Sequence, residues 1–377
     1  RKYAILKSMK ETNACTYAQQ WKRLPWLLLI PLGLLLPRLA ACYPEAAEAY
    51  ARYIYPWISR LLGAISGIFP FSLAEFLLYG LIIGVCGWLL WGVFSTILKK
   101  RPLVKLLRTV LTVGILGGVL LHVFYLAWGF NYARPTLYQL LDLPVQERPV
   151  EELEELCREL ATEAVWLREQ VPEDERGVFC LPAGWRESFS ALPAAYENLG
   201  AELPLFSQPA RSPKGVWLSE GMSWAGIAGI YIPFTAEANV NVHQPPLLLL
   251  SSGAHEMAHY LGFAREDEAN FIAYLACIHS KDPCIRYSGV MLALIHCGNQ
   301  LYKTDPIAYQ AVWEACYSPG MIRDLRGYNE YWDRYEGQVE AAVDQLNDGY
   351  LKHNQQESGV KSYGMMVDLL LAWRQAG

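Results

Sequence analysis

The chain has few charged residues for its length. Only 18% of its 377 residues are Asp, Glu, Lys or Arg, whereas ordinary soluble domains have about 25%. The net charge is −5, so the chain lacks the basic excess of a nucleic-acid-binding protein, and we expect no nucleic-acid partner. Charge is scarcest in the first third, where long apolar runs occur. The composition therefore predicts a membrane anchor over residues 1–130 and a separate compact domain over residues 131–377.

Three apolar runs predict transmembrane helices, at about residues 24–41, 71–98 and 103–128. Each is near or above the roughly 20 residues that a helix needs to cross a bilayer. The first run contains Pro37 and Arg38 near its end, and its alternative interpretation is a cleaved signal peptide. We favour a span, because the run is long for a signal peptide and Pro37 is a poor lead-in to a cleavage site. The lipid bilayer is thus an expected partner, and the residues between the first two spans are expected to form a loop.

The distribution of Lys and Arg predicts the orientation in the membrane. Basic residues precede the first span and separate the second from the third, whereas the loop after the first span balances Arg52 and Arg60 with Glu45 and Glu48. The basic clusters are Lys7, Lys10, Lys22 and Arg23, then Lys99, Lys100, Arg101, Lys105 and Arg108. Because short cytoplasmic loops are enriched in basic residues, we expect a multi-pass cell-membrane protein with a cytoplasmic N-terminus and an extracytoplasmic domain.

No CxxC pair occurs among the nine cysteines, which argues against a zinc site made of cysteines. Six cysteines fall in the predicted outer domain, and an even number outside the cytoplasm permits disulfides without fixing their pairing. Cys277 and Cys284 flank a turn with Pro283 and are the best-placed local pair.

Residue patterns in the outer domain predict a mainly helical, α+β fold with a small sheet. Apolar residues recur at three- and four-residue steps in residues 151–170, which is typical of an amphipathic helix. Residues 178–213 are rich in proline and are expected to be irregular. Further predicted elements are short strands at 215–218 and 229–234, helices at 247–261 and 266–279, and one long helix at about 329–350.

The segment His255-Glu256-Met257-Ala258-His259 carries the clearest chemical signal. Two histidines four residues apart on a helix project from one face and can bind one zinc ion. Glu256 lies beside the first of them and can take a proton from a metal-bound water as general base. The segment predicts a zinc-dependent hydrolase with His255 and His259 as ligands, Glu256 as catalytic base and Zn²⁺ as cofactor.

A third ligand is needed, and two acidic residues compete for this role. The residues after His259 resemble the gluzincin zinc peptidases, in which a glutamate from a second helix completes the site within a pattern such as Glu-x-Glu-Ala-Asp/Asn. The segment 266–270 (EDEAN) matches that pattern, although it follows His259 more closely than in the larger gluzincins. The resemblance implies Glu266 as the ligand, with Asn270 orienting a liganding histidine. Glu268 is the rival ligand.

Most of the chain also resembles an uncharacterised family of bacterial membrane proteins with three N-terminal spans and an outer metallopeptidase-like domain. The shared segments are residues 128–132 (WGFNY), 229–234 (GIYIPF), 255–270 and 359–364 (GVKSYG). This resemblance implies a zincin-like outer domain that hydrolyses a peptide, a protein or a peptidoglycan peptide.

Several assignments rest on weaker signals. Tyr363 is a candidate catalytic residue that would stabilise the oxyanion, a task that gluzincins often give to Tyr or His. Residues 229–234 are either an edge strand that pairs with substrate or an interior strand. The alternative function is a membrane-tethered sensor or binding module with a degenerate metal site. Catalysis inside the bilayer is disfavoured, because the HExxH segment lies far from the three spans in the sequence.

Overall fold

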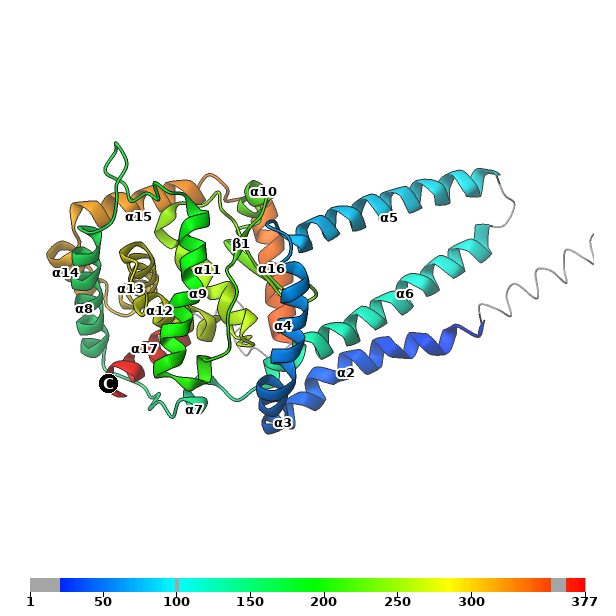
Figure 1. Cartoon of the computed structure of the whole chain (residues 1–377), viewed down its shortest axis with the longest axis horizontal. Helices are drawn as coiled ribbons and strands as arrows, with labels where there is room; N and C mark the ends of the chain where they lie inside the picture. Colours follow the sequence, from blue (N-terminus) through cyan, green and yellow to red (C-terminus); the bar gives the residue numbers. More distant parts are fainter. Residues whose placement is uncertain (1–20, 99–101, 354–363, 377) are drawn as a thin grey trace, which may run out of the picture.

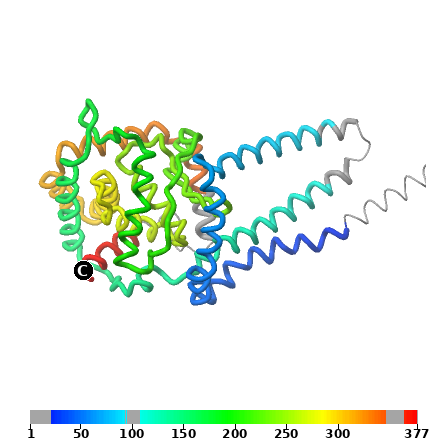
Figure 2. Tube along the Cα trace, viewed as in Figure 1, coloured from blue at the N-terminus to red at the C-terminus, as the bar shows by residue number. Residues whose placement is uncertain are grey.

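Three long helices extend from one side of a helical domain in the computed structural model (Figures 1 and 2). The structure describes residues 21–98, 102–353 and 364–376. The first long helix is formed by a short 3₁₀ segment, η1 (Leu24–Leu28), and α2 (Leu29–Ala41), and the others are α5 (Leu73–Leu98) and α6 (Pro102–Ala127). All three contain stretches long and apolar enough to cross a membrane, at Leu24–Ala41, Leu73–Gly92 and Leu107–Ala127. Three candidate spans are thus confirmed.

Glycines allow α2 and α6 to pack closely. A Cβ built on Gly118 would lie 2.8 Å from the Cβ of Leu29, and one built on Gly33 would lie 2.6 Å from Leu121. Small residues at such crossings let two helices approach in a membrane, where lipid competes with looser contacts.

The segment that connects the first two spans is itself helical, and the sequence patterns predicted no helix there. It forms α3 (Pro44–Ala49), a π-helical turn η2 (Tyr50–Ile54) and α4 (Tyr55–Ser66). In α4, Tyr55, Ser59, Gly63 and Ser66 recur at helical spacing and are buried against the domain. These mostly small residues gave little hydrophobic signal in the sequence. Tyr55 belongs to the main hydrophobic core, so this segment is part of the folded domain.

The domain core is built around α11 (Pro246–Tyr260), which packs against α9, α12, α13 and the sheet. Twelve of its fifteen residues are buried. The domain helices are α7 (Leu137–Leu140), α8 (Val150–Arg168), α9 (Trp185–Glu202), α10 (Ser219–Trp224), α11, α12 (Glu266–Ile278), α13 (Pro283–Thr304), α14 (Pro306–Cys316), α15 (Pro319–Trp332), α16 (Gln338–His353) and α17 (Gly364–Ala376), with short 3₁₀ segments η3 (Gly129–Ala133) and η4 (Pro204–Phe206).

Two sequence-based assignments of helices were wrong. Residues 178–213 contain α9, because Phe189, Leu192 and Leu199 form a buried apolar stripe that outweighs Pro193 inside the helix. The long helix expected at 329–350 is instead two helices, since α15 ends at Trp332 and α16 begins at Gln338.

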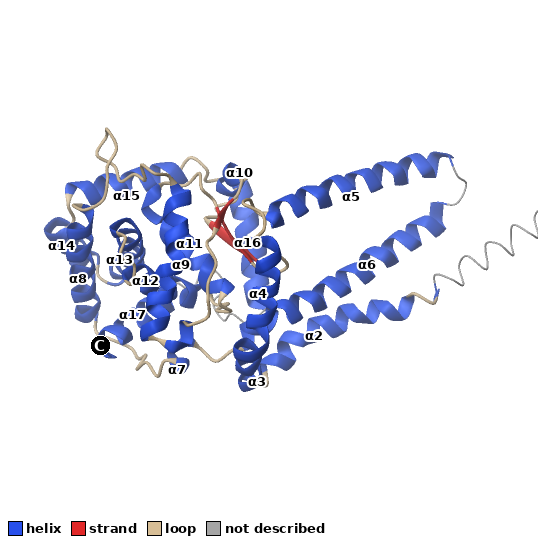
Figure 3. Cartoon of the chain, viewed as in Figure 1, coloured by secondary structure: helices blue, strands red, loops and turns tan. Residues whose placement is uncertain are grey.

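A three-stranded sheet lies beside α4, on the side of the domain where the long helices attach (Figure 3). Its order is β1 (Lys214–Gly215), β3 (Glu237–Val240) and β2 (Gly229–Ile232). β3 pairs in parallel with β1 and antiparallel with β2, which is therefore at an edge. The two predicted strands exist in part. The central strand β3 was missed, because its sequence EANV has few β-forming residues.

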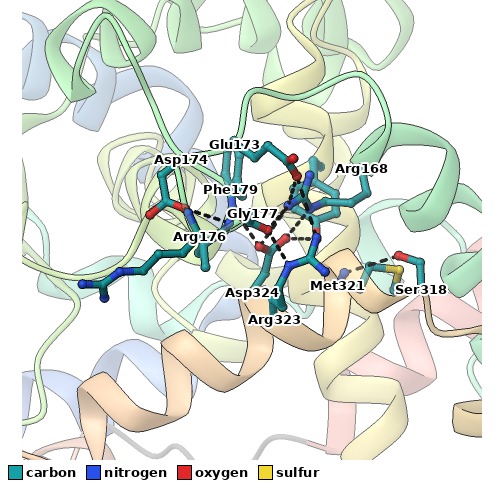
Figure 4. Close-up of polar contacts among 12 residues, drawn as sticks. Arg168, Glu173, Asp174, Arg176, Gly177, Phe179, Ser318, Met321, Arg323 and Asp324 are labelled. Carbon is teal, nitrogen blue, oxygen red and sulfur yellow. Dashed lines mark hydrogen bonds and ion pairs between the residues drawn. The ribbon is translucent and has the colours of Figure 1, made fainter.

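The buried carboxylate of Asp324 joins several helices of the domain (Figure 4). Asp324 on α15 accepts hydrogen bonds from Arg168 Nε at 2.6 Å, from the Tyr287 hydroxyl at 2.7 Å and from the backbone N–H of Phe179 at 2.7 Å. One charged side chain thus links α8, α13, α15 and the loop before α9.

The predicted pairing of Cys277 with Cys284 is not present. Both are free thiols, as are the other described cysteines. Cys277 is fully buried in α12 and faces α13, where a Cβ built on Gly289 would lie 2.2 Å from the Cβ of Cys277.

We expect Asp324→Ala to lower the free energy of unfolding by about 3–5 kcal/mol, because it leaves the buried Arg168 guanidinium without its carboxylate. Denaturant unfolding of the purified full chain in detergent measures this change. Glu173→Gln is the matched control, since Glu173 also pairs with Arg168 but is 53% exposed, and it should cost less than about 1 kcal/mol. Equal losses for the two variants would contradict this account of the network.

Candidate metal centre

A tight turn brings α12 back against the end of α11. Residues 261–265 connect the two helices, and Gly262 in this turn has a φ of +87°. A side chain is strained in this left-handed region, which makes glycine the favoured residue here. The turn places the first residue of α12, Glu266, beside the histidines in the last two turns of α11.

His255, His259 and Glu266 form the cluster that could hold a metal ion, with their ligand atoms all within 4.8 Å of one another. Glu266 Oε2 lies 3.1 Å from His255 Nε2, and Oε1 lies 3.7 Å from His259 Nε2. The imidazole rings are 4.6 Å apart at an interplanar angle of 87°. The two histidines are buried or nearly so, whereas the Glu266 side chain is 35% exposed. One side of the cluster is therefore open to solvent.

The other ring nitrogen of each histidine has its own partner. His259 Nδ1 lies 2.7 Å from the carbonyl oxygen of Phe263, which can only accept a hydrogen bond, so this nitrogen carries the proton. His255 Nδ1 lies 2.8 Å from Asn270 Oδ1. In the neutral state each Nε2 then offers a lone pair to the space shared with Glu266. Such outer partners fix ring orientation and tautomer in metal sites.

Glu256 lies between the cluster and the edge strand β2. It is almost fully buried, and its Oε2 has no hydrogen-bond partner among the residues that the structure describes. A Cβ built on Gly229 would lie 2.5 Å from Glu256 Oε1. Only glycine therefore fits at position 229 without displacing the carboxylate. The position of Glu256 thus depends on Gly229, which lies on β2 and not on α11.

Burial and neighbouring charges shift the proton affinities of these groups in the metal-free protein. Burial raises the pKa of Glu256 to about 7, and the Glu266 carboxylate acts in the same direction against the two histidines. Burial lowers the pKa of His259, but the Glu266 carboxylate outweighs it and raises this pKa to about 9. Burial raises the pKa of Glu266, but the two histidines hold it well below its usual range.

The rival acid Glu268 is used elsewhere. Its carboxylate accepts hydrogen bonds from the backbone N–H of Leu137 at 2.7 Å and from Arg265 Nη1 at 3.2 Å. Asn270 lies beside His255, as the resemblance implied. Tyr363 lies outside the described residues. Glu237 accepts hydrogen bonds from the backbone N–H groups of Leu73 and Ala74 at the start of α5.

Residues that follow the third span donate hydrogen bonds to the end of α11 and to the turn between α11 and α12. Sequence reasoning did not predict this role. Trp128 Nε1 donates to the carbonyl oxygen of His259 at 3.0 Å, and its ring lies edge-on to the His259 ring at 6.1 Å. Arg134 Nη1 donates to the carbonyl oxygen of Gly262 at 2.8 Å. The run WGFNY was noticed only as a shared segment, and nothing in its composition indicates a contact with position 259.

Fold and cluster together define the class: a membrane-associated, mainly helical protein with a His-His-Glu cluster at the junction of its spans and its domain. The model of the family described as "Protein of unknown function (DUF3810)" matches residues 50–371, and the chain belongs to this family. The match includes α4, two of the three candidate spans and both helices of the cluster. No curated protein and no solved structure matches the chain.

Chelator-treated protein should lose thermal stability as the pH rises from about 6.5 to about 9, which lies above the range in which His296, whose pKa burial lowers to about 4, acts in the opposite direction. Glu256 has a pKa above the usual 4.5, and His259 has one above the usual 6.5. Each group stabilises the fold fully at a pH below its usual pKa. This contribution is lost as the pH rises through about 7 for Glu256 and about 9 for His259. Melting temperatures across this range measure the effect. Glu256→Gln cannot titrate and should lack the part of the loss centred near pH 7. Superimposable curves for the two proteins would refute the assigned environment of Glu256.

Proposed function

We propose that this protein is a zinc-dependent peptidase whose metal is bound by His255, His259 and Glu266. The observation that carries the proposal is the convergence of two Nε2 lone pairs and one carboxylate on a shared space that has one open side. Three protein ligands with a fourth position left free is the arrangement of catalytic rather than structural zinc sites.

The donor set fits zinc on two counts. Ligand atoms about 2.0–2.1 Å from a tetrahedral ion lie roughly 3.3 Å apart, and the separations of 3.1 and 3.7 Å from Glu266 to the two Nε2 atoms bracket that value. Two imidazoles and one carboxylate also form a ligand set that zinc hydrolases use. The described cysteines all lie outside this cluster.

Zinc bound here would lower the pKa of a coordinated water and polarise the scissile carbonyl. The chain supplies the remaining steps. Glu256 Oε2, which has no hydrogen-bond partner in the described part of the chain, accepts the proton of the attacking water. Glu256 then passes this proton to the leaving amine, because a carboxyl group with a pKa of about 7 can both accept and donate a proton. The close approach of Gly229 of β2 to the Glu256 carboxylate limits where this carboxylate can move.

No strand among the described residues pairs with the outer edge of β2, and this edge provides a surface for an extended polypeptide. Opposite residues in an antiparallel pair alternate between hydrogen-bonded and non-bonded positions, and the bond from Asn241 N to Ala228 O fixes the alternation. Gly229 and Tyr231 therefore direct their backbone N–H and C=O groups away from β3. The Tyr231 N–H interacts with the Glu256 carboxylate and partly opposes the rise that burial causes in its pKa. A peptide, a protein or a peptidoglycan peptide added at this edge passes beside the proposed base.

The zincin-like nature of the domain and its orientation belong to the same proposal. The cytoplasmic N-terminus follows from the basic residues that flank the spans, and it places hydrolysis outside the cytoplasm.

Zinc content of site variants tests the ligand set. Wild type is expected to bind about one zinc per chain, and Glu266→Gln should lose far more affinity than the roughly 10–100-fold typical of an outer partner. Glu268→Gln should keep its zinc but melt at a lower temperature, because the Leu137 N–H loses its charged acceptor. Mass spectrometry of the native protein measures occupancy. Zinc lost from Glu268→Gln and kept by Glu266→Gln would reverse the assignment.

Turnover by Glu256→Gln tests the proposed base. The variant should retain zinc, since Glu256 is not in the ligand set, yet cleave peptides about 10²–10⁴-fold more slowly. Mass spectrometry of a mixed peptide library incubated with each protein follows the cleavage. If zinc-loaded wild type and Glu256→Gln both leave the library intact, the alternative of a sensor or binding module with a degenerate site replaces the peptidase.

A further inference from the structure

The candidate metal centre is tied directly to the membrane end of the molecule at three points. The first is Trp128, which follows the last residue of α6 and donates to the carbonyl oxygen of His259. The second is Tyr55 of α4, whose hydroxyl donates to the carbonyl oxygen of Tyr260 at 2.8 Å and lies 3.0 Å from the Tyr231 hydroxyl. One layer of side chains therefore separates the cluster from the start of the membrane region.

The third point is the far end of β2. Ile232, the last residue of β2, pairs with Glu237, whose carboxylate accepts from the first two backbone N–H groups of α5 at 3.0 and 2.7 Å. The other end of β2 is Gly229, beside Glu256. With a rise of about 3.3 Å per residue, the strand covers about 10 Å between the start of a span and the proposed base.

The helix α4 has an apolar face that the described residues leave exposed. Trp57 is 71% exposed and Leu61 is 65% exposed, Ile65 continues the stripe at helical spacing, and Ile68, in the turn after α4, is exposed as well. Figure 1 shows α4 lying crosswise to the long helices, at the ends where they join the domain. In the sequence, α4 lies between the spans of α2 and α5. An exposed apolar face on a helix in this position is typical of helices that lie in the interface of a bilayer.

Exposed side chains on neighbouring loops extend this face. Glu75 in the first turn of α5 accepts hydrogen bonds from the backbone N–H groups of Trp217 and Leu218, and it thereby holds these two exposed residues beside the span. Phe234, in the turn that follows β2, is exposed as well. Trp is enriched at membrane–water interfaces, and Trp, Phe and Leu are typical of surfaces that enter the headgroup layer.

We infer that α4 and these loops rest on the bilayer, and that the polypeptide cut at this site is itself anchored in the same membrane and is cut close to the membrane surface. An extended chain that leaves the bilayer and pairs with β2 reaches Glu256 after about three to five residues. Anchoring in the same membrane raises the local concentration of such a chain, whereas a soluble peptide must be captured from bulk solution. The claim that an anchored polypeptide is cut rests on the proposed peptidase function. The claim that the site lies on the bilayer does not depend on that function.

Lipid crosslinking tests the position. The photoreactive amino acid benzoylphenylalanine is placed at position 61 on α4 or at position 307 on α14, where Ile307 is 83% exposed at the opposite end of the domain. The full chain is reconstituted in phosphatidylcholine vesicles and irradiated, and mass spectrometry counts lipid adducts. Adducts at position 61 and none at position 307 are expected. Equal labelling, or no adduct at position 61, overturns the inference.

Anchored and free substrates test the second part. A randomised peptide segment is joined to a transmembrane helix through a Gly/Ser spacer of about 5 or about 30 residues, and the same segment is also supplied free in solution. Wild-type protein in vesicles should cut the short-spacer substrate fastest, about 10²-fold faster than the free peptide. Equal rates for anchored and free peptides overturn the inference and leave the peptidase proposal standing. If the protein cuts neither the anchored nor the free substrate, this result counts against the peptidase proposal. The crosslink at position 61 then still decides whether the site lies on the bilayer.

Discussion

The turn between α11 and α12 determines whether this chain has a metal site at all. Two histidines on one helix supply only two donors, and the third must come from another element. Gly262 at positive φ reverses the chain within residues 261–265, and Arg134 and Trp128 hold the carbonyl groups at this reversal. Glu266 then lies beside both histidines as a consequence of backbone geometry.

The same contacts couple the candidate site to the membrane anchor. Trp128 and Arg134 come from the chain that leaves α6, and Tyr55 comes from the segment between the first two spans. These residues are buried in the same core as α11 or bonded to its end. The segments that adjoin the spans therefore form part of the domain, and the family match, which begins at residue 50, includes Tyr55, Trp128 and Arg134.

The sequence predicted those features that depend on local patterns. Long apolar runs gave the three candidate spans, the apolar spacing of residues 151–170 gave α8, and the HExxH spacing placed His255 and His259 on one face of a helix. The order of acidic residues in EDEAN, together with a resemblance, indicated Glu266 rather than Glu268. Each of these signals lies within one continuous stretch of the sequence.

Features that depend on contacts between distant segments could not be predicted in this way. The helical nature of residues 44–66 is stabilised by burial of small residues against the domain, and β3 is a strand because it lies between two others. Gly229 matters through a carboxylate 27 positions later in the chain. Trp128 reaches a backbone carbonyl 131 positions away. No spacing rule within one element carries such information.

X-ray absorption at the zinc edge of the purified, membrane-reconstituted protein tests the central claim most directly. We predict a zinc signal whose nearest neighbours are nitrogen and oxygen only, with the outer scattering pattern of two imidazole rings. A first shell that contains sulfur, a pattern with one imidazole or none, or the absence of zinc from protein prepared without chelator would contradict it.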